Sequence, residues 1–257
     1  MCTFAKNKMK KIIFLIIFIC VIAITIWWRA PILGSEWNKQ TLYVGLLDTW
    51  YGRSGDPKAY AMWIDDDSSI GVFKPKKIAD SLGIPVNFAV IADKMVPEVA
   101  DSLASWQRQG AGIIIHGFRH EPWKKWDESQ IENDIRNSYH RLHEQGFDTA
   151  QILKIIVPPH GCNTKSIRMA IKQHGCQMMT GANLINPDRH SFQLGRIGID
   201  SNTDINTMRE LLEKAYKRKA FVILSTHSSI PENFSIEKTQ EVLQIVKEMG
   251  FSFNIYE

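Results

Sequence analysis

The stretch AYAMWIDDD, residues 59–67, decides how this chain folds. Its first six residues form a short apolar run, which is typical of a buried strand. The run ends at Asp65, Asp66 and Asp67, and adjacent carboxylates repel one another unless a cation or hydrogen bonds offset their charge. We therefore expect a buried strand with an acidic group at its C-terminal end, although an acidic loop that caps the next helix would give the same pattern.

Strand-like and helix-like segments alternate along most of the chain. Further strands are expected at residues 41–47, 86–91, 112–115, 152–157, 177–180, 195–199, 221–224 and 251–256. Helices are expected at residues 75–82, 97–109, 129–145, 164–174, 207–218 and 237–249. This alternation predicts an α/β fold with a parallel sheet and crossover helices. With about seven such units, a closed or nearly closed barrel is favoured over an open sheet.

Polar residues follow five of the expected strands. In a barrel of parallel strands the C-terminal ends all open on one face, where side chains from different strands converge. The polar positions are residues 65–67, His116, the turn of Pro159, His160 and Gly161, Asp200, and His227. One polar residue after a strand means little, but five on the same side predict a site.

His116 and His120 stand four residues apart, so they share one face if the chain turns helically after its strand. Neutral imidazole suits Zn, Fe, Ni or Cu better than Mg or Ca. The spacing alone would fit two surface or core histidines at least as well. Together with one aspartate of residues 65–67, however, the pair predicts a metal site with a coordination position left for water. A second aspartate would act as general base toward that water.

His227 ends the last long buried run, at residues 221–224. A lone histidine in this place is more often a satisfied structural residue. In a metal-dependent amidohydrolase it has a defined task, which is to protonate the leaving amine. A position across the site from the metal would separate the acid from the base.

In this order, the motifs resemble the polysaccharide deacetylase family, which is carbohydrate esterase family 4 with its NodB-like domain. The motifs are Ile64-Asp65-Asp66, His116-x3-His120, the Pro-Pro-x-Gly turn of residues 158–161 and the Leu-x-x-His of residues 224–227. The resemblance extends from Ala59 to Tyr256. It implies a distorted (β/α)7 barrel, a divalent metal that is most often Zn²⁺, and hydrolysis of an N-acetyl, occasionally an O-acetyl, group on a sugar polymer.

The resemblance also implies a role for each matching residue. Asp65 would be the general base and His227 the general acid. The implied metal ligands are Asp66, His116 and His120. A backbone N–H near the turn would help to stabilise the oxyanion, and this turn consists of Pro159, His160 and Gly161.

The aspartate motif departs from the family pattern. The family usually has Thr-Phe before the aspartate pair and Gly after it, whereas Trp63-Ile64 and Asp67 stand here. A shifted register, with Asp66 as the base and Asp67 as the ligand, is therefore a second interpretation.

The turn motif departs as well. The family's arginine before Pro-Pro is replaced by Val157, so Asp65 loses its support and Asp200, the best match to the tuning aspartate, loses its partner. His160 replaces an aromatic residue and could itself bind substrate or donate a proton. We expect a divergent branch of the family with altered substrate preference. Trp123 and Trp126 have two equal interpretations: their rings stack on a sugar, or they pack their loop onto the rim of the barrel.

The N-terminus differs in composition from the rest of the chain. Residues 12–28 form an apolar run broken only by Thr25, behind four lysines. At about 1.5 Å per residue the run is about 25 Å long, the short end for a spanning helix. The lysines predict a cytoplasmic tip at residues 1–11, a transmembrane anchor at 12–28, a tether at 29–40 and an exported, periplasmic or extracellular, catalytic domain at 41–257. A cleaved signal peptide is the competing interpretation.

The net charge of +4 is partly due to the N-terminal lysines and is too weak to indicate nucleic-acid binding. Cys162 and Cys176 are separated by a helix of about ten residues, or about 15 Å, so no disulfide is expected.

Three functions remain: a membrane-tethered deacetylase of an N-acetylated glycan, a non-catalytic glycan-binding protein on a deacetylase-like barrel, and a metal-dependent hydrolase of another amide or ester.

Overall fold

The computed structural model describes residues 56–181 and 185–253. The expected tip, transmembrane anchor and tether, at residues 1–11, 12–28 and 29–40, lie outside this part of the chain, as does the strand expected at residues 41–47. Among the helices that are described, none is long and apolar enough to cross a bilayer.

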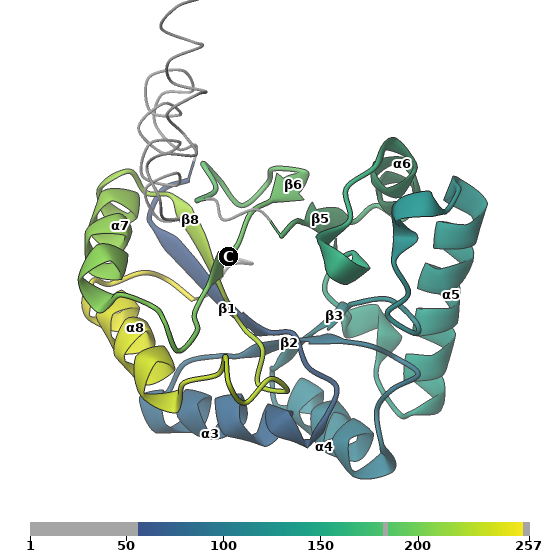
Figure 1. Cartoon of the computed structure of the whole chain (residues 1–257), viewed down its shortest axis with the longest axis horizontal. Coiled ribbons are helices and arrows are strands. Elements are labelled where there is room, and N and C mark those ends of the chain that lie inside the picture. The colour runs from purple at the N-terminus through teal and green to yellow at the C-terminus, as the bar shows by residue number, and fades with distance from the viewer. Residues whose placement is uncertain (1–55, 182–184, 254–257) are drawn as a thin grey trace, which may run out of the picture. The chain divides into compact units, whose positions relative to one another are not determined.

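The described strands form one parallel sheet that curls on itself, with helices on its outer side (Figure 1). The strand order is β6-β5-β4-β3-β2-β1-β8-β7. The strands are β1 (Tyr60–Asp65), β2 (Asn87–Val90), β3 (Gly112–Ile115), β4 (Ile155–Ile156), β5 (Gln177–Met179), β6 (Gln193–Leu194), β7 (Ile197–Gly198) and β8 (Phe221–Thr226). The expected (β/α) barrel is confirmed in this coarse form. Within the described residues, β6 and β7 are edges that do not pair with each other, so the sheet formed there is a half-barrel that hydrogen bonds do not close.

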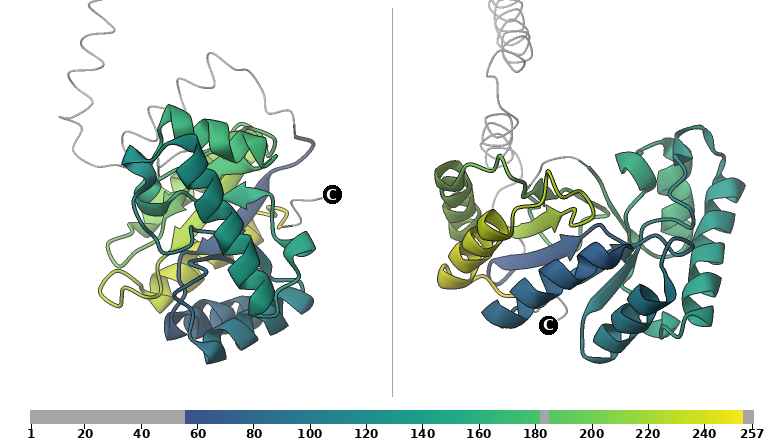
Figure 2. Two further views of the ribbon diagram at one scale, coloured as in Figure 1. Left: turned by 90° about the vertical axis from the view of Figure 1, so that its right-hand side faces the viewer. Right: turned by 60° about the horizontal axis from the view of Figure 1, so that its bottom comes forward.

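Helices cover the outside of the sheet. They are α3 (Phe73–Leu82), α4 (Pro97–Arg108), α5 (Glu128–Glu144), α6 (Lys165–Gln173), α7 (Ile205–Lys217) and α8 (Ile236–Glu248), each within two residues of its expected bounds. Their starts follow from capping side chains, such as Asp127 in a capping box with Gln130 at α5 and Thr164 at α6. Helices α5 and α6 pack together, as do α7 and α8 (Figure 2).

Alternate residues of the strands build a core inside the curled sheet. Tyr60, Met62 and Ile64 of β1 belong to one buried cluster with side chains from β2, β3, β4, β5, β6 and β8. Side chains alternate between the two faces of a strand, so only the inner face of a curled sheet can bring all of these residues together. The same alternation carries Asp66 toward the inside of the half-barrel and Asp65 toward the helices.

The strand expected at residues 195–199 is divided in the structure. β6 ends at Leu194 and β7 begins at Ile197, and these strands lie at opposite edges of the sheet. The intervening chain spans at most about 11 Å, so the two edges approach each other here. Asn186 holds the crossing, because its Nδ2 donates to the Gly195 carbonyl at 2.9 Å and its Oδ1 accepts from the Gly195 N–H at 2.7 Å. Arg196 is thereby fixed at the seam of the half-barrel.

Candidate active site

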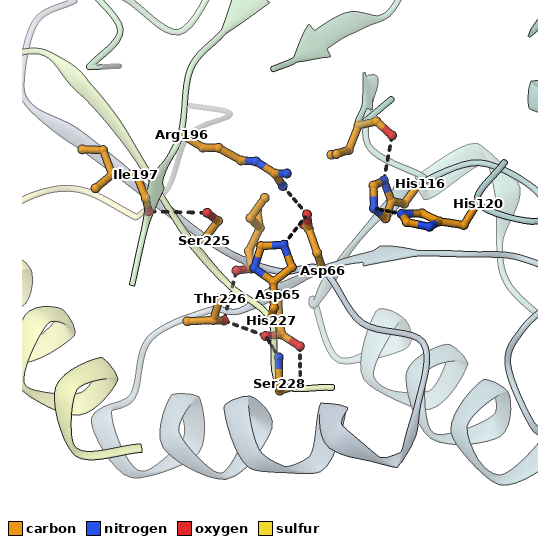
Figure 3. A network of polar contacts seen from close by, with 12 residues as sticks. Asp65, Asp66, His116, His120, Arg196, Ile197, Ser225, Thr226, His227 and Ser228 are labelled. Carbon is orange, nitrogen blue, oxygen red and sulfur yellow. Dashed lines mark hydrogen bonds and ion pairs between the residues drawn. The ribbon is translucent and has the colours of Figure 1, made fainter. Parts of the chain in front are cut away.

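Asp65 and Asp66, at the end of β1, point to different sides of the strand (Figure 3). Asp65 faces the end of β8, where Oδ1 accepts from Thr226 Oγ1 at 2.6 Å and from the Ser228 N–H at 3.2 Å. Asp67 turns back on its own loop and accepts from the N–H groups of Ser68 at 2.6 Å and Ser69 at 2.7 Å. Neither carboxyl has a hydrogen bond to the histidine pair in the described structure.

Ser228 joins these two outer carboxyls. Its Oγ lies 2.6 Å from Asp65 Oδ2 and 2.9 Å from Asp67 Oδ2, although a hydroxyl has only one proton to donate. Burial, together with the charges of Asp67 and Asp66, raises the pKa of Asp65 to about 7 against the opposing effect of hydrogen bonds from Ser228 and Thr226. With a proton on Asp65, that carboxyl donates to Ser228, which then donates to Asp67.

Asp66 is the carboxylate that faces the inside of the half-barrel. Its Oδ2 forms an ion pair with Arg196 and lies 3.5 Å from His227 Nε2. Its Oδ1 is buried and has no hydrogen-bond partner within the described part of the chain. Burial by itself would raise the pKa of Asp66, but the Arg196 guanidinium and His227 hold it well below its usual range.

His116 and His120 meet on the same side as Asp66 (Figure 3). His116 Nδ1 lies 2.8 Å from the Val157 carbonyl, so we assign its proton to Nδ1 and leave Nε2 free to act as a ligand. Burial lowers the pKa of His116. Burial and the neighbouring His116 and His160 together lower the pKa of His120 to about 4. Both imidazoles are therefore neutral at pH 7, as metal ligands must be.

The separation of the two histidine nitrogens fits either a hydrogen bond between the rings or a shared metal ion. Their Nε2 atoms lie 3.1 Å apart, close to the separation of about 3.3 Å for two nitrogens bound tetrahedrally at about 2.0–2.1 Å. Even so, no group of three His, Cys, Asp or Glu side chains in the described residues could hold a metal ion. Of the predicted ligands, the structure brings together His116 and His120, whereas Asp66 is turned toward Arg196 and His227.

The predicted turn of residues 159–161 lies against the histidine pair. His160 Nε2 is 3.1 Å from the His120 carbonyl, and the two rings are 4.4 Å apart between centroids. Both residues have positive φ, 61° at His120 and 56° at His160, which is uncommon outside glycine and is concentrated at functional sites. Gly117 permits the close approach, because a Cβ at its φ of 81° would lie 2.7 Å from Pro159 Cγ.

Other candidate residues lie apart from this group. Asp200 is exposed and caps its own turn, accepting from the Asn202 N–H at 2.8 Å. Trp123 is fully buried, so it packs the loop and does not stack on sugars, while Trp126 is half-buried. Cys162 and Cys176 are free thiols, as expected.

Residues 52–179 match the family model described as polysaccharide deacetylase. The chain belongs to the polysaccharide deacetylase family. No curated protein sequence matches it.

Solved structures of carbohydrate esterase family 4 share the fold of this deacetylase family member. The Xyl-CE4 domain of a multidomain xylanase from the hindgut metagenome of Trinervitermes trinervoides matches with TM-score 0.57 and 14% identity, over 77% of this chain and 87% of that chain. An acetyl xylan esterase of Clostridium thermocellum with a cobalt ion matches with TM-score 0.56 and 12% identity, over 76% and 86%. A pseudoenzyme of Bacillus anthracis matches with TM-score 0.52 and 13% identity, over 78% and 65%. At these identities the likeness shows the fold alone.

Arg196 is a site residue that the motifs of the polysaccharide deacetylase family did not predict, as are Thr226 and Ser228 beside Asp65. It contacts Asp66 from the seam between β6 and β7, not from the position before Pro158, where Val157 stands. The sequence does hold a signal for it: a lone cation within an apolar, strand-like run is buried only if an anion pairs with it.

Proposed function

We propose that this protein is a metal-dependent hydrolase that removes acetyl groups from an N-acetylated cell-envelope or extracellular glycan. The observation that carries the proposal is the His116–His120 pair, whose Nε2 atoms lie 3.1 Å apart on the same side of the half-barrel as Asp66, whose Oδ1 has no partner among the described residues. Membership of the deacetylase family supports acetyl hydrolysis on a sugar polymer.

The residues fit a divalent metal in kind, since two neutral imidazoles and one carboxylate oxygen are ligands that Zn²⁺ accepts. His116, His120 and Asp66 would hold it. When bound, the metal would polarise the acetyl carbonyl and lower the pKa of a water molecule.

His227 is the proton carrier in this proposal. Its side chain is 44% exposed, so a substrate can reach it, and its Nε2 lies 3.5 Å from Asp66 Oδ2. The imidazole would take a proton from the attacking water and return it to the leaving amine as the C–N bond breaks, which yields acetate and a free amino sugar. The Asp66 carboxylate stabilises the imidazolium that exists between the two transfers.

The turn at residues 159–161 would orient the substrate. It packs against His120 through His160. The candidate oxyanion donor is the His160 N–H, because Pro159 has no N–H and that of Gly161 donates to the Pro158 carbonyl at 3.1 Å. Asp65 would help to position His227, because it forms a hydrogen bond with Ser228, the next residue along the chain.

Acetate release from N-acetylglucosamine oligomers and from peptidoglycan, with and without a chelator, tests the activity. We expect release that stops with chelator and returns with Zn²⁺. The absence of release from a broad panel of acetylated glycans, acetyl xylan included, by metal-loaded protein would refute the proposal.

Asparagine variants at Asp65, Asp66 and Asp67 test which carboxyl takes part. We expect Asp66→Asn to lose at least about 10²-fold in rate and Asp65→Asn less than about tenfold, since only Asp66 faces the histidines. A 10²-fold or larger loss in a folded, metal-binding Asp65→Asn protein would instead support the family's assignment of Asp65 as the general base. Loss of metal from Asp67→Asn alone would support the shifted register.

A non-catalytic glycan-binding protein is the second candidate. It is favoured by one observation, that no three possible ligands in the described residues lie close enough together to hold a metal. Glycan binding that persists in Asp66→Asn protein, with no turnover by the parent, would establish it.

We also propose that the N-terminal run anchors the chain in a membrane and exports the catalytic domain. The lysines before residues 12–28 support this orientation. Protease added to intact cells should remove the catalytic domain, and protection of the domain would contradict the proposal.

A further inference from the structure

Arg196 reaches the site from an unusual place in the fold. It lies in the two-residue crossing from β6 to β7, at the seam of the half-barrel, where Asn186 fixes the backbone of Gly195. From there its guanidinium extends inward to Asp66 at the end of β1 (Figure 3). The side chains of Arg196 and Asp66 are only 10% and 1% exposed, so the pair is shielded from water.

Asp66 needs a cation at this position. It lies between two other acidic residues, its carboxylate is buried, and an uncompensated buried charge is strongly destabilising. The other basic groups near it are histidines: His227, which is 44% exposed, and His116, whose buried ring is neutral. Arg196 is therefore the permanently charged partner.

The same carboxylate is the anionic ligand that the proposed metal site requires. In the described structure Asp66 turns its Oδ2 to Arg196, and the histidine pair stays without a third ligand. A guanidinium and a divalent cation beside one carboxylate repel each other, and in a buried site this repulsion is weakly screened.

We propose that Arg196 is a built-in counter-ion that neutralises Asp66 when the metal is absent and competes with the metal for that carboxylate. It pairs with Asp66, whereas the arginine that Val157 replaces would support Asp65. The inference rests on the proposed metal site, and it makes Arg196 a positioning residue that sets metal affinity. The protein thereby stays folded after the metal is lost, but it binds the metal more weakly.

The first test measures the stability of the full-length protein in chelator. Arg196→Met should lower the melting temperature, because Asp66 loses its counter-ion, and the double variant with Asp66→Asn should recover most of the loss. Arg189→Met is the matched control, since Arg189 pairs with Asp56 at side-chain exposures of 10% and 2%. Adding Asp66→Asn should not rescue that variant.

The second test measures Zn²⁺ affinity by competition with a chromophoric chelator. Arg196→Met should bind Zn²⁺ at least about tenfold more tightly than the parent, because the competing charge is gone. Its melting temperature should also rise more on adding Zn²⁺ than that of the parent. Arg196→Lys keeps the charge and should bind within about threefold of the parent.

The outcomes separate this inference from the proposed function. Equal or weaker Zn²⁺ binding by folded Arg196→Met refutes competition, whether or not the parent has deacetylase activity. If the parent binds no metal, the proposed metal site fails, and rescue by Asp66→Asn in chelator then decides the counter-ion role alone. If Arg196→Met does not fold, a folded double variant supports the counter-ion role, and an unfolded one refutes it.

Discussion

Replacing Asp65 by asparagine should make the metal-free protein more stable at pH 8 and change its stability by only about 0.5 kcal/mol at pH 4. Asp65 is fully buried, and its pKa rises from 3.8 to about 7. Asparagine reproduces the protonated carboxyl: its amide can donate to Ser228 Oγ, which is then free to donate to Asp67 Oδ2. The substitution therefore removes a buried charge without removing a hydrogen bond.

The sign and size follow from the difference in pKa between the folded and unfolded states. Below pH 3.8 both states bind the proton, and as the pH rises toward 7 only the folded state keeps it, so stability falls over this window. A shift of about 3 units at about 1.36 kcal/mol each gives a loss of about 4 kcal/mol by pH 8, as an upper bound. Asp65→Asn should recover up to this amount.

Other titrating groups do not obscure the comparison. Burial raises the pKa of Asp134 to about 6, so this group also makes stability fall as the pH rises. Burial lowers the pKa of His120 to about 4, so this group makes stability rise with pH. Because the pKa of Asp66 is lowered, its contribution to the stability of the protein is lost only as the pH falls below 3.8. All three are present in both proteins, so the difference between them isolates Asp65.

Urea unfolding of the full-length protein in chelator, from pH 4 to pH 8, measures the effect. Asp80→Asn is the control, because Asp80 is an exposed carboxylate on α3 and should change stability by less than about 0.5 kcal/mol at any pH. The reasoning fails if the two proteins differ equally at all pH values, or if Asp65→Asn is the less stable at pH 8.

Three further substitutions have defined outcomes. Gly71→Ala should lower the free energy of unfolding by about 2 kcal/mol or more in urea titrations, because its Cβ would lie 2.8 Å from the Ser228 carbonyl and against Asp67. Gly117→Ala should lower acetate release by more than tenfold while the far-ultraviolet circular dichroism stays native, since positive φ and Pro159 leave no room for a methyl group beside His116; unchanged release would contradict this placement of the turn. His227→Gln should lower the rate by about 10²-fold or more with Zn²⁺ affinity unchanged within about threefold, and a parallel loss of metal would make His227 a ligand instead.

The fold was predictable to the extent that apolar runs and capping residues reveal it. The run of residues 59–64 became β1, and Asp127 and Thr164 begin helices close to their expected positions. The division between β6 and β7 was not predictable, because an apolar run at residues 195–199 does not show that its first part joins one edge of the sheet and its last part the other.

The orientation of the aspartates could not be predicted for a different reason. Every residue of β1 is buried, so the strand has apolar side chains on both faces and no alternation of polar and apolar positions. Without alternation, the sequence does not show which aspartate continues the inner row of Tyr60, Met62 and Ile64. The pairing of Arg196 with Asp66 depends on contacts across 130 positions and follows only from the curled sheet.

The end of β1 places three carboxyls side by side, and the structure offsets each charge by a different means. Burial raises the pKa of Asp65 to about 7, so this carboxyl keeps its proton up to about that pH. Asp67 accepts hydrogen bonds from two N–H groups of its own loop, and Asp66 forms an ion pair with a guanidinium. A proton and backbone hydrogen bonds keep the first two carboxyls engaged on the outer side of the strand. Of the three, only Asp66 keeps an oxygen with no partner among the described residues, so the acidic run provides one carboxylate on the side of the histidines and two that hold the loops around it.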